Sequence, residues 1–284
     1  MEATIKKDKT EITVTDKGAE PVSIKYDGKE RLWQNENGSW PAHAPVLFPV
    51  CGKCKIRADG INYPCKRHGF AKDSTFTLAK QMKNSLVFRL NSNKRSMRQY
   101  PFEFVFDVIY EITDEGSLTI AYEVHNTQSK ELYFSCGGHD SFALEKDVSN
   151  YELLFEKDES FDSLLVDKRG NLTGEAETIG NGKILDLSTH LLENGSSVCL
   201  DHIKSRGVIL REKDGGRNIA AVWFSKSDKI ILWHPEGSKM ICIEPWQNLP
   251  DSKKDKDTEF SDKDGVIKVL PYGTARIDRT ITYY

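Results

Sequence analysis

The most constraining feature of this sequence is a long stretch in which apolar and polar residues alternate. Over residues 102–112 every second side chain is large and apolar. The turn residues 114–117 then separate it from a second alternating stretch at 118–125. A period of two gives each stretch one apolar face, and the short separation favours antiparallel pairing. Residues 102–126 are therefore predicted to form a β-hairpin.

Short stretches of the same kind recur along the whole chain. No stretch keeps an apolar period of 3.6 residues over three turns, which disfavours a parallel sheet covered by helices. About twenty short strands are too many for one twisted open sheet. The sequence thus predicts an all-β fold, a large antiparallel β-sandwich of two stacked sheets, with one domain over 1–284. Turn-forming pairs separate the stretches: Asp27-Gly28, Asp59-Gly60, Asn194-Gly195 and Asp264-Gly265.

Composition and charge limit the classes of partner. Hydrophobic residues make up 38% and charged residues 29%, as in globular proteins, and 40 basic against 43 acidic residues give a net charge of −3. Basic residues are not concentrated, so we expect no nucleic-acid partner. No apolar run approaches the roughly 20 residues that cross a bilayer, and residues 1–16 lack the apolar core of a secretory signal. We expect a cytoplasmic protein without a membrane partner, as a monomer or homodimer.

The six cysteines are too few and too irregularly spaced for a disulfide scaffold, so reduced thiols are expected. Cys51 and Cys54 form a CxxC pair, with Cys65 further along the chain. A structural zinc site would need a second close pair, and a redox pair would be expected at a strand-to-helix junction. We interpret the spacing as coincidence and expect no metal. The motifs GxGxxG, GxxxxGK[ST], GxSxG and HExxH are missing as well.

Three segments combine an ionisable side chain with neighbouring glycine, proline or aromatic residues, as loops at the rim of a sheet do. In the segment 240–251, Glu244 follows three residues of an apolar strand and precedes Pro245 and Trp246. Apolar surroundings raise the pKa of a carboxyl group and make it a usable general base near neutral pH. The alternative is a solvated glutamate at a strand end.

The other two segments each contain a candidate histidine. His139 follows a Gly-Gly pair, and an ordinary histidine pKa near 6.5 suits proton transfer. His68 lies in the sequence RHGFA and has the same interpretation. Either could instead be a turn histidine that is hydrogen-bonded to the backbone. Aromatic residues in or near these segments could stack on a sugar ring or belong to the core: Trp40, Phe142, Trp233 and Trp246.

Taken in order, these segments resemble the aldose 1-epimerase (galactose mutarotase) family, and specifically its LacX-like bacterial branch. The resemblance covers most of the chain. It implies a one-domain super-sandwich whose concave sheet has a shallow cleft for a monosaccharide, with a hexose as the expected ligand. The matching segments are Trp40 with APVLFPVCGK (44–53), RHGFA (67–71), GGHDSFAL (137–144) and CIEPWQNLPD (242–251).

The resemblance also implies roles for individual residues. Glu244 would be the general base on the anomeric hydroxyl, and His139 would protonate the ring oxygen. His68 would bind the sugar and polarise the ring oxygen, while Lys53 and Trp246 would be substrate contacts. A glutamate and a histidine on opposite sides of one carbon suffice for ring opening, so no cofactor is expected.

Two positions depart from the family pattern. Lys53 stands where the family commonly has arginine, and a lysine lacks the bidentate fork that grips paired hydroxyls. Asp140 follows His139, where proline is more usual, so Asp140 is expected in the binding site and could alter how the imidazole is held.

The expected substrate depends on the basic residues near the cleft. Arg67 and three lysines would suit a phosphorylated or acidic sugar, or they could be solvated rim residues. The leading hypothesis is a hexose mutarotase. The alternatives are a non-catalytic carbohydrate-binding sensor and a hexose-6-phosphate 1-epimerase. The three lysines are Lys53, Lys55 and Lys72.

Overall fold

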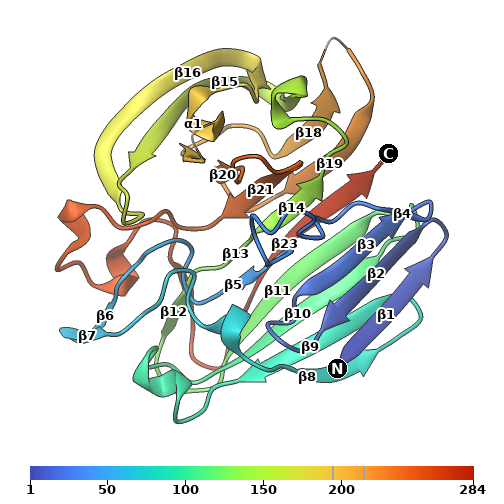
Figure 1. The fold of residues 1–284 in the computed structure, drawn as a ribbon. Helices are drawn as coiled ribbons and strands as arrows, with labels where there is room; N and C mark the ends of the chain where they lie inside the picture. The colour runs from blue at the N-terminus through green and yellow to red at the C-terminus, as the bar shows by residue number, and fades with distance from the viewer. Residues whose placement is uncertain (194, 214) are drawn as a thin grey trace.

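The computed structural model describes residues 1–193, 195–213 and 215–284, and β-strands form most of its regular structure (Figure 1). This confirms the predicted all-β class. Among the described residues, helical structure is limited to short pieces, and no helix there is long and apolar enough to cross a membrane. These pieces are α1 (His190–Glu193) and the 3-10 helices Ala71–Asp73, Ser96–Arg98, Val148–Asn150, Lys253–Asp255 and Phe260–Asp262.

The N-terminal segment forms a four-stranded antiparallel sheet in chain order. Its last two strands are joined by Asp27 and Gly28, which have φ angles of 52° and 75°. Positive φ at both central residues is the conformation that two-residue hairpin turns need, so this predicted turn is confirmed. The strands are β1 (Glu2–Lys7), β2 (Thr10–Thr15), β3 (Pro21–Tyr26) and β4 (Lys29–Glu30).

Within the described residues, fifteen strands join into one large antiparallel sheet. Its path runs β5-β13-β21-β20-β17-β15-β18-β19-β23-β11-β10-β9-β8, with β14 also on β21 and β16 on β15. The strands are β5 (Val46–Leu47), β8 (Thr77–Gln81), β9 (Ser85–Asn91), β10 (Phe104–Ile112), β11 (Leu118–Asn126), β13 (Gly137–Gly138), β14 (Asp140–Ala143), β15 (Tyr151–Val166), β16 (Leu172–Asp186), β17 (Ser197–Leu200), β18 (Gly207–Glu212), β19 (Asn218–Phe224), β20 (Lys229–Trp233), β21 (Met240–Trp246) and β23 (Thr274–Tyr283).

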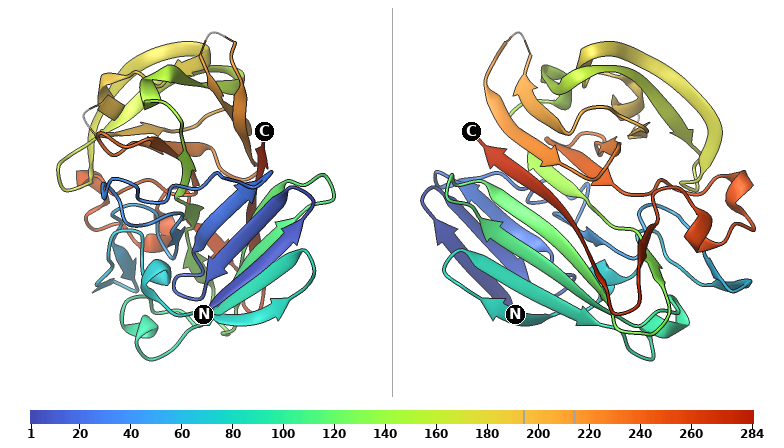
Figure 2. Two further views of the ribbon diagram at one scale, coloured as in Figure 1. Left: turned by 45° about the vertical axis from the view of Figure 1, so that its right-hand side comes forward. Right: turned by 180° about the vertical axis from the view of Figure 1, so that it is seen from behind.

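The predicted hairpin is present as β10 and β11, which pair along their whole length. Phe106 and Val108 on β10, and Tyr122 and Val124 on β11, are buried, as the period of two requires. The four-stranded sheet lies against this part of the large sheet, with β1 beside β9 (Figure 2). Side chains from both sheets form one hydrophobic cluster that extends from Ala3 to Tyr283.

The prediction of two stacked sheets is correct in class but differs in one respect. Most strands belong to one continuous sheet, which is joined on one face by the four-stranded sheet. The long β15–β16 hairpin forms an arch over β20 and β21 (Figure 1). Bulges in the β15–β16 pairing bend these strands, so the second layer is supplied by the four-stranded sheet over one part of the large sheet and by the hairpin over another.

Two small sheets complete the fold. They are β6 (Ile56–Ala58) with β7 (Ile61–Tyr63), and β12 (Leu132–Phe134) with β22 (Ile267–Val269). The predicted turns at Asp59-Gly60 and Asp264-Gly265 are both observed next to these strands. The fourth predicted turn includes Asn194, which lies outside the described residues.

Candidate active site

Glu244 and His139 are brought together by the pairing of β21 with β13 and β14. The two short strands pair with β21 in the same register, which places His139 directly opposite Glu244. Because side chains alternate between the two faces of a sheet, both point to the same face. The pairs that fix this register are Gly137 with Trp246 and Asp140 with Ile243.

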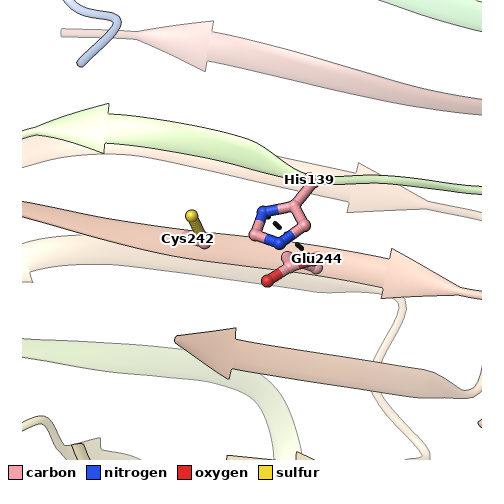
Figure 3. A group of neighbouring side chains, drawn as sticks. All are labelled: His139, Cys242 and Glu244. Atoms are coloured by element: carbon pink, nitrogen blue, oxygen red, sulfur yellow. Dashed lines mark ion pairs between the residues drawn. The ribbon is translucent and has the colours of Figure 1, made fainter. Parts of the chain in front are cut away.

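The two side chains are in close contact in a buried environment. Nδ1 of His139 lies 3.4 Å from Oε2 of Glu244, and the imidazole lies over the carboxylate (Figure 3). Glu244 is 1% exposed. Trp246 donates from Nε1 to Oε2 of Glu244 at 3.1 Å and to the carbonyl of Gly138 at 3.2 Å. One indole therefore connects the strand of the histidine with the carboxylate.

Burial controls the protonation of this pair. Desolvation raises the pKa of Glu244 well above its usual range, and the charge of Asp140 adds to the effect, while the hydrogen bond from Trp246 opposes it. Desolvation lowers the pKa of His139 to about 3. Groups this close titrate as a pair. Burial thus disfavours the charged form of both groups and favours a proton on the carboxyl group over one on the imidazole.

Three aromatic rings surround His139. Trp40 stacks on the imidazole with ring centroids 4.9 Å apart, and Trp233 meets it edge-on at 5.8 Å. His68 is also edge-on, at 5.5 Å. The indole of Trp33 donates to the carbonyl of Trp40 at 2.9 Å and holds the Trp40 segment in place. The imidazole is thus restricted to a narrow range of orientations.

His68 is held by a backbone turn. Its φ angle is 64°, and its own N–H donates to the carbonyl of Gly52 at 2.7 Å. The N–H of Gly52 donates in return to Nδ1 of His68 at 3.1 Å, which places the proton of the neutral ring on Nε2. Burial, followed by the charges of His139, Arg67 and Lys72, lowers the pKa of His68 well below its usual range. His68 is thus a neutral hydrogen-bond donor.

These side chains line one cavity of about 640 Å³. The candidates His68, His139, Glu244 and Trp246 all contribute to its wall. The tip of the β15–β16 hairpin, including residues 166–168, closes one side. Further lining residues include Trp40, Trp233, Lys53, Arg67, Lys72 and Lys168.

The basic candidates differ in their contacts. Arg67 donates from Nη2 to the carbonyl of Arg169 at 3.1 Å, so it also fastens the hairpin tip. Lys72 is paired with Asp73 at 3.0 Å. Lys53 and Arg67 line the cavity, but Lys55 does not.

Asp140 is expected in the binding site but lies apart from the other predicted site residues. It does not line the cavity, because its side chain points to the face opposite His139. There it is 3% exposed and accepts two hydrogen bonds from Arg279, at 2.5 and 2.7 Å. The alternation of the strand therefore places the Asp140 side chain on the face away from the cavity. Phe142 is buried on the same strand and packs on Tyr283.

Two groups of side chains among the described residues have the composition and spacing of metal ligands. His139, Cys242 and Glu244 offer atoms within 4.8 Å of one another (Figure 3). Burial and the nearby charge of Glu244 raise the pKa of the Cys242 thiol, however, and a protonated thiol is a poor metal ligand. The thiol would therefore have to lose its proton before it could act as a ligand.

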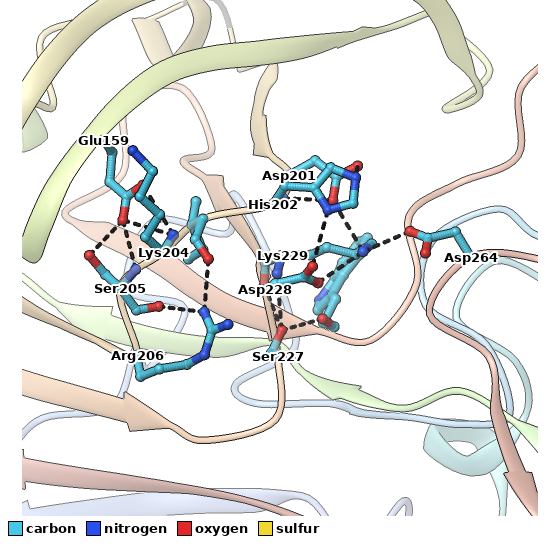
Figure 4. Close-up of polar contacts among 12 residues, drawn as sticks. Glu159, Asp201, His202, Lys204, Ser205, Arg206, Ser227, Asp228, Lys229 and Asp264 are labelled. Atoms are coloured by element: carbon cyan, nitrogen blue, oxygen red, sulfur yellow. Dashed lines mark hydrogen bonds and ion pairs between the residues drawn. The ribbon is translucent and has the colours of Figure 1, made fainter.

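The second group consists of Asp201, His202 and Asp228. The buried ammonium of Lys229 already lies 3.1 Å from Asp201, 2.9 Å from Asp228 and 2.7 Å from Asp264 (Figure 4). A lysine therefore supplies the positive charge that these carboxylates need. Lys229 lies opposite Trp246 on the neighbouring strand, so this network supports the end of β21.

The cysteines are all free thiols. Cys51 and Cys54 are not bonded to each other, and burial raises the pKa of both. Burial also raises the pKa of Cys65 to about 12. Burial thus keeps these thiols in the protonated form, which is a poor nucleophile.

Sequence reasoning missed Arg279 and the hairpin tip. Arg279 interrupts an alternating stretch in which Ile277 and Ile281 point to the same face. A lone charge at an apolar position of a strand is a signal that could have identified it. The hairpin tip carries no such signal, because its place over the cavity depends on long-range pairing.

Comparisons with known proteins point to one protein family and one fold. The sequence model of the aldose 1-epimerase family matches residues 1–268. The chromosomal LacX protein of Lactococcus lactis subsp. lactis is 30% identical over an alignment 289 residues long, and this alignment covers 93% of each chain. The structure of a galactose mutarotase-like protein from Lactobacillus casei is similar, with a TM-score of 0.87, 25% identity and full coverage of both chains.

A galactose mutarotase-related enzyme from Lactobacillus acidophilus has the same fold, with a TM-score of 0.85 and 24% identity over 100% of this chain and 97% of that one. A galactose 1-epimerase from Lactobacillus acidophilus also shares the fold, with a TM-score of 0.73 and 12% identity over 100% of this chain and 94% of that one.

Proposed function

Because the chain belongs to the aldose 1-epimerase family, we propose that it interconverts the α and β anomers of a hexose by general acid–base catalysis. The observation that carries this proposal is the contact of His139 with Glu244 at 3.4 Å in the wall of a cavity. Mutarotation removes one proton from the sugar and delivers another, so a pair that holds one proton has the required stoichiometry.

In the proposed reaction, Glu244 accepts the proton of the C1 hydroxyl as the bond between C1 and the ring oxygen breaks. The ring oxygen takes a proton from His139, and C1 becomes an aldehyde carbon. Rotation about the C1–C2 bond then presents the other face of the carbonyl. On closure the ring hydroxyl returns its proton to His139, and Glu244 returns its proton to the carbonyl oxygen.

The buried pair must reach its ionised form before this step. Burial alone favours the neutral form, with the proton on Glu244. Hydroxyl groups of a bound sugar would donate hydrogen bonds to the carboxylate and reduce the cost of its ionisation. Nδ1 of His139 lies 3.4 Å from Oε2 of Glu244 and has no hydrogen-bond partner among the described residues, so the two atoms must move closer before the proton is transferred. Substrate binding would thereby prepare the acid and the base together.

The remaining candidates have binding roles in this proposal. His68 offers its Nε2 proton to the ring oxygen, and Lys53 and Arg67 offer positive charge to hydroxyl oxygens. Trp40 and Trp233 present aromatic surface that suits the C–H face of a sugar ring. Trp246 contributes its ring to the cavity wall, and its N–H orients Glu244.

The test is polarimetry of freshly dissolved α-D-glucose and α-D-galactose with wild-type protein and Glu244→Gln. The variant keeps shape and hydrogen-bonding capacity but loses the base, so kcat should fall about 10²- to 10⁴-fold while sugar affinity stays within about tenfold. Glu111→Gln, exposed on β10, is the control and should keep the wild-type rate. Full activity in Glu244→Gln would remove Glu244 as the base.

A second candidate substrate is a phosphorylated hexose. The cavity is lined by four basic side chains, Lys53, Arg67, Lys72 and Lys168, and such a group suits an anionic substituent. Mutarotation of glucose 6-phosphate, measured by NMR exchange under the same conditions, separates the two substrates. If the protein binds a sugar but does not accelerate its mutarotation, the result would instead favour a non-catalytic carbohydrate-binding protein.

A further inference from the structure

The reverse face of the sheet behind the proposed acid and base carries a buried ion pair. Because side chains alternate along β13 and β14, Gly138 and Asp140 face away from the cavity on either side of His139. Arg279 reaches this point from β23, which is not adjacent to β21 in the sheet. The pair thus connects two parts of the sheet that share no backbone ladder.

The contact between Arg279 and Asp140 uses both carboxylate oxygens. Nε and Nη2 of Arg279 donate to the two carboxylate oxygens of Asp140 at 2.5 and 2.7 Å. Nη1 donates to the hydroxyl of Tyr122 at 2.9 Å, and the guanidinium lies 5.2 Å from the centre of that ring. The side chains of Arg279 and Asp140 are 5% and 4% exposed. A bidentate contact of this kind fixes both distance and orientation.

The residue on the other side of His139 is also in contact with the guanidinium. A Cβ atom on Gly138 would overlap Arg279, so glycine is required for the backbone to lie this close. The carbonyl of Gly138 in turn accepts the hydrogen bond from Trp246, which also donates to Glu244. Arg279 thus binds one neighbour of His139, Asp140, and packs closely against the other, Gly138, which is linked through Trp246 to the carboxylate.

We propose that Arg279 and Asp140 form a positioning pair, which holds the backbone at His139 from behind and keeps the imidazole in place against Glu244. This inference rests on the proposed function, because it assigns a purpose to the alignment of the acid and the base. Neither residue touches the substrate. Their effect on the reaction is through the position of His139.

A purely structural pair would not explain where these charges are placed. Burying two charges is costly, and apolar residues of similar volume often stabilise a core as well or better. Apolar packing holds a strand less specifically than two directed hydrogen bonds. Small displacements of an acid or base matter in catalysis, since an error of about 1 Å can lower a rate about 100-fold. A directed contact behind His139 meets that requirement.

The experiment compares Asp140→Asn with Asp107→Asn. Asp107 accepts a similar bidentate contact from Arg89, at 2.7 and 2.6 Å, on the remote pair of strands β9 and β10. Asp140→Asn should lower kcat about 10- to 100-fold with KM within about twofold, because binding groups in the cavity stay in place. Asp107→Asn should change neither quantity. Equal effects of the two variants on kcat would overturn the proposal.

A second readout does not depend on activity. The side-chain 1H–15N signals of His139, assigned from a His139→Gln spectrum, should shift in Asp140→Asn and stay unchanged in Asp107→Asn. If the wild-type protein does not accelerate mutarotation, the proposed function fails. A selective shift of the His139 signals would still support the positioning pair. Unchanged His139 signals in Asp140→Asn would overturn it, whatever the activity.

The single variant leaves Arg279 buried without a partner charge and could fail to fold. The double variant Asp140→Asn with Arg279→Gln removes both charges and keeps two amides in hydrogen-bonding distance. It should fold, keep KM and show the same loss in kcat and the same shift of the His139 signals. Wild-type kcat in a folded double variant would contradict the proposal.

Discussion

At the scale of single residues, the site depends on two groups whose buried environments shift their pKa values in opposite directions. Glu244 and His139 would each titrate at an ordinary pH in water. In the folded chain, desolvation moves the pKa of Glu244 up and that of His139 down to about 3. Over the range between these values the pair keeps one proton. It is therefore ready for a reaction that consumes and releases one proton in each cycle.

This predicts an unusual pH profile. The pair loses its base only when it takes up a second proton, which the pKa of His139 places at about 3. We expect kcat for mutarotation to remain nearly constant from pH 7 down to about pH 5, with no acid limb near the ordinary histidine value of about 6.5. Polarimetry at low buffer concentration checks this, with the rate measured for Glu244→Gln subtracted as the background. An acid limb near pH 6.5 would show that His139 titrates as an exposed imidazole.

At the scale of elements, His68 is placed against Trp246 of β21 by the loop that holds it. This loop crosses close to the chain at Phe48, where Phe48 and Gly69 form an isolated bridge. Gly69 has a φ angle of 69°, and a Cβ atom there would overlap the carbonyl of Phe48. The position of His68 thus depends on a glycine for both its conformation and its lack of a side chain.

Gly69→Ala should therefore destabilise the protein by more than about 1 kcal/mol, because steric overlap adds to the cost of positive φ. It should also weaken sugar binding, since the adjacent His68 would be displaced. Gly28→Ala is the matched control, with a φ angle of 75° but open space around its Cβ position. Urea unfolding measures the stability of each, and equal losses in both variants would show that the close approach to Phe48 has no energetic role.

At the scale of the whole molecule, the cavity wall is continuous with the hydrophobic core. Leu47 lines the cavity, and the next residue, Phe48, points into the core. Phe48 stacks on Phe106 with ring centroids 4.2 Å apart, and Phe106 also contacts Tyr122, the partner of Arg279. The core between the sheets therefore supports the site from beneath.

Phe106→Ala should lower the free energy of unfolding by about 3 to 5 kcal/mol, because it leaves a cavity in a fully buried aromatic cluster. Leu270→Ala, at a side chain that is 63% exposed, should change it by less than about 0.5 kcal/mol. Chemical denaturation with urea compares the two variants. A loss below about 1 kcal/mol for Phe106→Ala would mean that the cluster relaxes and contributes little to the core.

Much of the fold was predictable, because the alternation of apolar and polar residues reports directly on which face of a strand is buried. The hairpin of β10 and β11 and the turn at Asp27-Gly28 follow from it. The continuous large sheet could not be predicted from the alternation, since a period of two says nothing about which strand pairs with which. The arch of β15 and β16 over the cavity could not be predicted for the same reason.

The sequence by itself determined the strands, the family resemblance and the residue types His139 and Glu244 that acid–base chemistry needs. Only the tertiary structure decided that these two face each other, because the register of β13 and β14 on β21 is a long-range pairing. It also decided that Asp140 points away from the cavity toward Arg279. A one-residue step along a strand reverses the face of a side chain, so neighbours in sequence can have opposite roles.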